Sequence, residues 1–166
     1  RVAKGLGIAL PAKAPAAAPV QDLKASPKLS IQKNMIETLQ GRCVGILIDE
    51  GSDAAAIQKL QKEITKAGGS SKLVAPKLKG ITLSDKTKIN ADGQLAGTPS
   101  QLFDAVALIL TDKAAKMLTK EGAAVQFVAD AFGHLKAIGF NADAMPLLDK
   151  AGIAKDEGVK ELGKDF

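Results

Sequence analysis

Carboxylates occur at two points where an apolar run of the sequence ends. The pentapeptide Asp-Glu-Gly-Ser-Asp occupies residues 49–53, and Asn-Ala-Asp occupies residues 141–143. If both follow parallel strands, Glu50 and Asp143 would lie at neighbouring strand ends, where paired carboxyl groups can act as general acid and base. A structural role competes with this one, because Asp143 is expected to cap a helix, and Glu50 and Asp53 lie near a helix start, where negative charge is stabilising.

Other kinds of chemistry have few residues to work with. The single histidine, His134, is expected near the C-terminal end of a helix, and the single cysteine, Cys43, is expected to be buried in the apolar run 43–48. Neither belongs to a pattern typical of a metal site, a Ser/His/Asp triad or a Cys/His pair. There is no glycine-rich phosphate loop, and the three carboxylates of residues 49–53 would repel a phosphate. We therefore expect neither a metal nor a cofactor in this chain.

The length and composition fit one ordinary domain with a tail. Of the 166 residues, 46% are hydrophobic, which is enough to fill a core. The longest apolar run, residues 105–110, is far shorter than the roughly 20 residues that cross a membrane, so we expect a soluble protein without a membrane partner. The net charge of +5 comes with lysines spread along the chain and with no Trp or Tyr for stacking, so nucleic acid is not an expected partner. The compartment stays open, with the cytoplasm slightly favoured over secretion.

Three segments differ in composition. Residues 1–9 resemble the end of a helix that belongs to an upstream region, and residues 10–40 form a lead-in whose prolines and alanines favour an extended linker. Residues 41–166 carry the alternating pattern of a folded domain. A linker at this place predicts a further domain before it.

Within the folded part, buried apolar runs alternate with helical spacing. The expected elements are strands at 44–48, 72–75, 105–110, 136–141 and from 158, and helices at 52–67, 120–135 and 143–148. Between them, short alternating pieces and an Asp-Gly at 92–93 indicate a small antiparallel hairpin. Ser52 and Asp143 are the expected N-caps, and Leu135 is expected on a buried helix face. This order predicts an α/β fold, a three-layer α/β/α sandwich around a mainly parallel sheet.

From residue 42 onward the chain resembles the flavodoxin-like superfamily of PfpI-type peptidases and class I glutamine-amidotransferase-like proteins. Residues 44–53, Val-Gly-Ile-Leu-Ile-Asp-Glu-Gly-Ser-Asp, are similar to the family's first strand, glycine and acidic residue. Residues 136–153, Lys-Ala-Ile-Gly-Phe-Asn-Ala-Asp-Ala-Met-Pro-Leu-Leu-Asp-Lys-Ala-Gly-Ile, resemble the family's elbow. In that elbow a lysine-led strand leads to a Cys-His-Gly turn, a Leu-Leu helix and Ala-Gly.

The resemblance places the family's catalytic positions on residues of this chain. The nucleophilic Cys falls on Ala142, the following His falls on Asp143, and the acidic partner falls on Asp53, with Glu50 and Gly51 close to it in sequence. We expect Asp53 and Ala142 at adjacent strand ends. Because alanine has no thiolate to attack a substrate, the resemblance implies a vestigial site and no catalytic residue in this chain.

A closer resemblance extends over nearly the whole chain. Residues 1–8, the linker and Ser-Pro-Lys-Leu-Ser-Ile at 26–31 resemble the join in large-subunit haem catalases, whose flavodoxin-like C-terminal domain also lacks the Cys. Such a parent decomposes hydrogen peroxide to water and oxygen on a haem held by a tyrosinate, and this chain has no Tyr. The resemblance therefore implies that haem sits in the parent core. Family members usually continue into a final helix, which we expect to be missing or shortened after residue 161.

The preferred interpretation is a non-catalytic accessory domain of a large-subunit haem catalase. It would contact the catalase core and the neighbouring subunits of a tetramer, and would contribute to stability or assembly. Apolar surface exposed in the isolated domain could also hold unfolding client proteins, as a chaperone does. Two alternatives stay open: a divergent PfpI-like hydrolase or glyoxalase that uses Asp53 and Glu50, and a module that binds a small ligand beside Gly51 and Ala142.

Overall fold

The computed structural model describes residues 6–10, 12–19, 21–31, 33–34 and 38–163. The chain divides into two units, Arg1–Ile36 and Glu37–Phe166. Residues 1–5 of the expected upstream remnant lie outside the described residues. So do residues 164–166, at the end where the family's final helix is expected to be missing or shortened.

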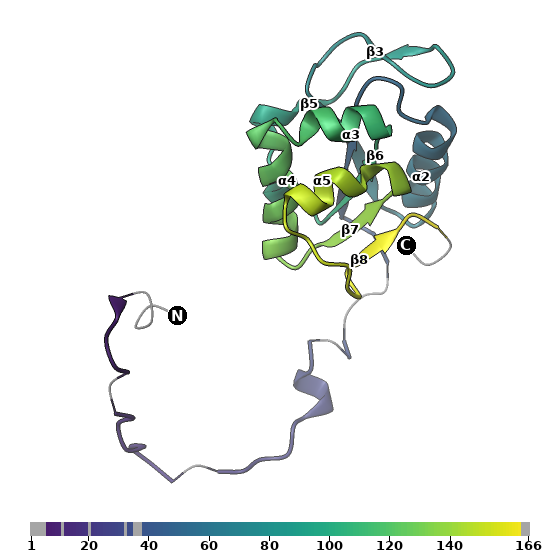
Figure 1. The fold of residues 1–166 in the computed structure, drawn as a ribbon. Coiled ribbons are helices and arrows are strands. Elements are labelled where there is room, and N and C mark those ends of the chain that lie inside the picture. The colour runs from purple at the N-terminus through teal and green to yellow at the C-terminus, as the bar shows by residue number, and fades with distance from the viewer. Residues whose placement is uncertain (1–5, 11, 20, 32, 35–37, 164–166) are drawn as a thin grey trace. The chain divides into compact units, whose positions relative to one another are not determined.

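The described residues of the first unit form a mostly extended arm that contains the 3-10 turn η1 (Pro27–Leu29) (Figure 1). The Asn34 side chain closes this turn, because its Nδ2 donates to the backbone carbonyls of Lys28 and Ser30 at 3.0 and 2.9 Å. None of the described residues of the arm is buried. Its large apolar side chains are mostly exposed: Leu10 by 80%, Leu23 by 78%, Leu29 by 83% and Ile31 by 82%.

The second unit is built on a six-stranded sheet with the order β5-β2-β1-β6-β7-β8. The strands are β1 (Cys43–Ile48), β2 (Ser70–Ala75), β5 (Gly93–Gln94), β6 (Ala105–Ile109), β7 (Ala137–Phe140) and β8 (Val159–Glu161). Every neighbouring pair is parallel. In the centre of the sheet, Leu47 of β1 pairs with Val74 on one side and Leu108 on the other. The predicted mainly parallel sheet is confirmed, and its strands read as apolar runs because helices cover the sheet.

Helices lie on both faces of this sheet, as a three-layer sandwich requires (Figure 1). The helix α2 (Ala54–Lys66) covers one face, and α3 (Asp112–Leu118), α4 (Gly122–Gly133) and α5 (Met145–Lys150) cover the other. Side chains of β1 alternate between the two: Ile46 packs in the core on the α2 side, and Leu47 packs in the core on the α4 side. This alternation follows from the two-residue period of a strand.

A small antiparallel hairpin is present, but its turn is not at the expected Asp-Gly. It consists of β3 (Ile81–Thr82) and β4 (Lys88–Ile89), and its turn is held by Asp85, whose carboxylate accepts from the Thr87 N–H at 2.9 Å. This bond and a second one from the Thr87 hydroxyl lower the pKa of Asp85. Asp92 instead accepts from the Leu73 N–H at 2.7 Å and leads β5 into the main sheet.

The helices of the structure differ from the sequence prediction. The N-cap of α2 is Asp53, whose Oδ1 accepts from the N–H groups of Ala55 and Ala56 at 2.9 and 3.1 Å, and not Ser52. The seven-residue α3 was not expected. Leu135 is 92% exposed and not on a buried face, because it follows the end of α4 with a left-handed backbone (φ 57°).

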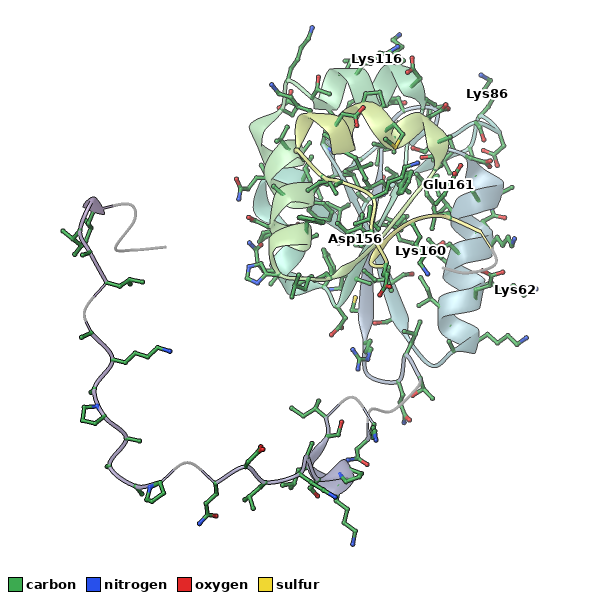
Figure 2. All side chains as sticks on the ribbon, turned by 60° about the horizontal axis from the view of Figure 1, so that its bottom comes forward. Lys62, Lys86, Lys116, Asp156, Lys160 and Glu161 are labelled. Carbon is green, nitrogen blue, oxygen red and sulfur yellow. The ribbon has the colours of Figure 1, made fainter. Side chains whose placement is uncertain are left out.

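The edge strand β8 carries charged side chains. Lys160 and Glu161 are both exposed on this strand (Figure 2). Charges on an edge strand hinder pairing with the strand of another molecule. Figure 2 also shows Lys116 on α3, where it forms an ion pair with Asp112 at 2.7 Å.

Candidate functional site

The loops that carry the sequence-predicted site all leave the same edge of the sheet. Because β1, β6 and β7 are parallel, their carboxyl ends meet at one edge. The chain moves outward from β1 to β2 through α2 on one face, and from β6 to β7 through α3 and α4 on the other. The switch point between β1 and β6 is where open parallel sheets bind ligands.

The prediction that Asp53 and Ala142 lie at adjacent strand ends is wrong. Both follow strands that end at this edge, but β6 lies between β1 and β7, so the two strand ends are not adjacent. For the same reason Glu50 and Asp143 are not a carboxylate pair on neighbouring strands. The order of strands in a sheet depends on long-range pairing, which the apolar runs do not encode.

Two polar side chains join the strand ends to one another. Ser52 is fully buried, and its hydroxyl donates to the Ile109 carbonyl at 2.6 Å and accepts from the Asp49 N–H at 2.9 Å. Asn141 forms a pair of bonds with the backbone of Leu110, accepting from its N–H at 2.9 Å and donating to its carbonyl at 2.7 Å. These bonds satisfy backbone groups at the strand ends, and they close the edge from β1 across β6 to β7.

The elbow itself offers little chemistry. Ala142 and Asp143 are exposed and lie in the 3-10 turn η4 (Ala142–Ala144) before α5. The expected cap at Asp143 is wrong, because the N-cap positions of η4 and α5 are Asn141 and Ala144, and neither makes a side-chain cap bond. Pro146 in the first turn of α5 has no backbone N–H, so one donor fewer is left there for a capping side chain to satisfy.

Glu50 and Gly51 hold the β3/β4 hairpin against the sheet. The Glu50 carboxylate pairs with Lys77 at 2.8 Å and accepts from the Thr82 N–H at 3.0 Å, and these contacts lower its pKa. The Gly51 N–H donates to the Thr82 carbonyl at 2.7 Å. Gly51 has a φ of 80°, a conformation that side-chain-bearing residues rarely adopt. Both residues therefore have a structural role in this fold.

Acid is expected to loosen the hairpin. The contacts of the Glu50 carboxylate lower its pKa in the folded state. They therefore stabilise the fold fully at a pH above the unfolded-state pKa, and this stabilisation is lost as the pH falls below about 4. The protection factors of the β3 and β4 amides, which correct for the slower intrinsic exchange in acid, should fall in this range when exchange is followed by NMR. Glu50→Gln should show fast exchange already at neutral pH, and an unchanged exchange rate in this variant would contradict the anchoring role.

A pocket of about 630 Å³ opens beside the closed edge, on the side of β2. It lies at the ends of β1, β2 and β6 and against α3, and Asp49, Glu50, Gly51, Pro76, Lys77 and Thr111 are among its lining residues. The loop at 49–51 was expected at a ligand site, whereas Lys77 and Thr111 were missed. Thr111 caps α3 by accepting from the Ala114 N–H at 3.1 Å, and the Thr-Asp pair at 111–112 was the available signal for that helix.

Metal and haem sites find no support among the described residues. They contain no group of three or more His, Cys, Asp or Glu side chains placed to hold a metal. His134 is the C-cap of α4 and is exposed, and the chain has no Tyr to ligate haem iron. Cys43 is only partly buried, at the start of β1 where the strand emerges from the core. Over the part of the chain that the structure covers, no helix combines the length and apolarity needed to traverse a bilayer.

Comparison with known families shows to which family this chain belongs. Residues 40–163 match the family model of the C-terminal domain found in long catalases. The chain belongs to this family. The catalase C-terminal domain is 43% identical over 166 residues to catalase C of Rhizobium meliloti, covering 98% of this chain and 24% of that protein. It is 28% identical over 159 residues to catalase HPII of Pseudomonas aeruginosa, covering 96% of this chain and 22% of that protein. The chain thus spans about a quarter of the length of these relatives.

Solved structures confirm the predicted fold of the catalase C-terminal domain. A two-domain protein from Anabaena variabilis, with DJ-1/ThiJ/PfpI-like and ferritin-like domains, matches with a TM-score of 0.63 and 17% identity, over 69% of this chain and 34% of that one. A ThiJ/PfpI domain protein from Brachyspira murdochii matches with a TM-score of 0.61 and 12% identity, over 70% and 67% of the two chains. At these identities the likeness concerns the fold alone.

Proposed function

We propose that this domain is a non-catalytic accessory part of a haem catalase and contributes to the stability or assembly of its subunits. The observation that carries the proposal is the closed carboxyl edge. Ala142 stands where the resemblance puts a nucleophile, and the Asn141 side chain takes up the backbone N–H and carbonyl of Leu110 beside it. An elbow with no nucleophile, whose asparagine is bonded to the backbone, offers no group for turnover, and peroxide chemistry would belong to the haem of the parent core.

The arm supports a role in contacts with the parent protein. Leu23, Leu29 and Ile31 expose about 80% of their surface, and each such side chain gains about 1.5–3 kcal/mol when it is fully buried. The catalase core or a neighbouring subunit of the expected tetramer is the surface that would cover them. The arm would then join the domain to the assembly through apolar contacts.

A domain exchange in a relative tests this role. We expect that catalase C of R. meliloti loses thermal stability and subunit association when its matching C-terminal quarter is deleted, because apolar contacts between subunits are removed. Replacing that quarter with this chain should restore both, while turnover per haem stays unchanged. Melting temperature, gel-filtration mass and peroxide consumption would be measured on all three proteins.

The arm provides the matched control for this exchange. Two variants of the replacement chain are compared. The apolar variant carries Leu23→Ser, Leu29→Ser and Ile31→Ser, and the charged variant carries Lys24→Ser and Lys28→Ser. The apolar variant should restore stability less well than the charged variant. Equal stability of the deleted and intact catalases would contradict the accessory role.

The same exposed arm favours a second candidate, the holding of unfolding proteins. Exposed apolar surface can bind other exposed apolar surface. We expect that a several-fold molar excess of this chain lowers the light scattering of a heat-aggregating client, and that the variant with three serines in the arm does so less. Scattering that is unaffected by the chain would rule this activity out.

The enzymatic alternative has less support from the geometry. Asp53 is bonded to the first turn of α2, and Glu50 is bonded to Lys77 and Thr82. A hydrolase or glyoxalase that used these two carboxylates would have to release them from structural contacts, at a cost in stability.

A further inference from the structure

The pocket beside the closed edge has the position and size of a ligand site. It lies outside the carboxyl ends of β1, β2 and β6, next to the switch point of the sheet. Its volume of about 630 Å³ falls within the range of small-molecule sites, roughly 300–1,000 Å³. Ala142 and Asp143 do not line it, so this pocket is distinct from the elbow.

Its wall combines apolar side chains from two elements. Pro76 follows β2, whereas Ala114, Met117 and Leu118 belong to α3. Leu118 is buried and packs in the core, whereas Met117 is 59% exposed. An exposed methionine is a flexible apolar surface that adapts to the shape of a ligand.

One carboxylate in this pocket is left without a side-chain partner. Asp49 is half-buried, and among the described residues no side chain donates a hydrogen bond to its carboxylate. Burial raises the pKa of Asp49, whereas the nearby Lys77 and the Glu50 backbone N–H offset this rise only in part. A ligand that brought a positively charged donor would stabilise this carboxylate.

The other charges of the pocket balance one another. Glu50 and Lys77 neutralise each other in their ion pair. Besides Asp49, the remaining lining charges are Lys113, Lys120 and Glu121. No ion pair or side-chain hydrogen bond involves these three among the described residues. With two carboxylates and two ammonium groups, the pocket favours a ligand that carries both signs over a simple anion or cation.

We propose that this pocket binds a small zwitterion with an apolar body, such as a short peptide with a free ammonium and a free carboxylate. The ammonium would bind Asp49, the apolar body would lie on Met117 and Pro76, and the carboxylate would face Lys113 or Lys120. The proposal goes beyond the accessory role in catalase assembly and does not depend on it.

The test titrates the 166-residue chain with leucylphenylalanine and with its N-acetyl form, which lacks the ammonium. NMR should show saturable binding with a Kd of about 1 mM or tighter, with shifts confined to residues 49–51, 76–77 and 111–118. N-acetylation should weaken binding at least about tenfold, and so should Asp49→Asn. In the Asp49→Asn variant the two probes should bind equally, because the carboxylate that distinguishes them is gone.

Two controls keep this test decisive. Asp49→Asn should melt no lower than the unchanged protein at neutral pH, since it removes a carboxylate that burial disfavours, so weaker binding cannot result from unfolding. Asp143→Asn at the elbow should leave the affinity unchanged. The proposal is overturned by the absence of saturation up to about 10 mM, by equal affinity of both probes for the unchanged protein, or by shifts centred on Ala142.

Discussion

Replacement of Gly45 by alanine is expected to lower the free energy of unfolding by about 1–3 kcal/mol, the usual cost of inserting an atom into a packed core. Gly45 lies in the middle of β1, between Val44 and Ile46. A Cβ at this position would collide with the ring of Phe103, with Cε2 only 2.7 Å away. Phe103 cannot move aside easily, because it is 4% exposed and packs against Phe127 with ring centroids 6.3 Å apart. Urea denaturation followed by circular dichroism would measure the loss.

A second glycine gives the matched control for this substitution. A Cβ at Gly122, the first residue of α4, would have no neighbour within 4 Å. Gly122→Ala should therefore leave the stability unchanged or raise it slightly, since alanine favours the helix. The smaller side chain of Phe103→Leu should recover part of the loss in a Gly45→Ala background. If both glycine variants are equally stable, Phe103 does not constrain β1 as inferred.

The elements that the sequence predicts well are those with a strong local signal. The runs that became β1 and β6 contain no charged or polar side chain because both faces of the sheet are covered, and only Gly45 interrupts their larger apolar residues. The end of α2 was equally readable, because Gly68 follows it with a φ of 85°, a conformation in which glycine has no steric penalty.

The elements that the sequence predicts poorly depend on partners far along the chain. Ser52 and Asp53 are both good N-caps, and the choice between them follows from the Ile109 carbonyl, which takes the Ser52 hydroxyl from 57 residues away. The Asp92 carboxylate likewise accepts from the distant Leu73 N–H, so Asp92 does not form the predicted hairpin turn. The candidate pocket combines both cases. Its loop at 49–51 was predictable and α3 had a local signal in Thr111-Asp112, whereas Lys77 lies beside this loop only because β2 pairs with β1.

Lys136→Met is expected to cost about 1.5–3 kcal/mol, the range for hydrogen bonds made by a charged group. Lys136 precedes β7, and its ammonium donates to the backbone carbonyls of Ser100 and Gln101 at 3.0 and 3.1 Å and to that of Phe103. These carbonyls belong to the 3-10 turn η3 (Ser100–Leu102) and the residue after it, before β6. Methionine keeps the length and the apolar stem but removes every donor. The loss would be measured by urea denaturation, and Lys59→Met, on the exposed side of α2 and without a described side-chain bond, should have little effect.

Lys136 and Gly45 should not act independently, because both depend on Phe103. The lysine holds the Phe103 carbonyl, and the glycine makes room for the Phe103 ring. Once Lys136→Met frees this segment, the ring can shift away from a Cβ on β1, so Gly45→Ala should cost less in that background. The double variant should therefore be less destabilised than the sum of the single variants by about 0.5–3 kcal/mol, as for other contacting groups. Strict additivity would mean that the lysine does not restrain the ring. Such coupling would give a physical reason for a lysine at the head of the strand that leads to the elbow: it fixes the entry to β6, the strand that lies between β1 and β7.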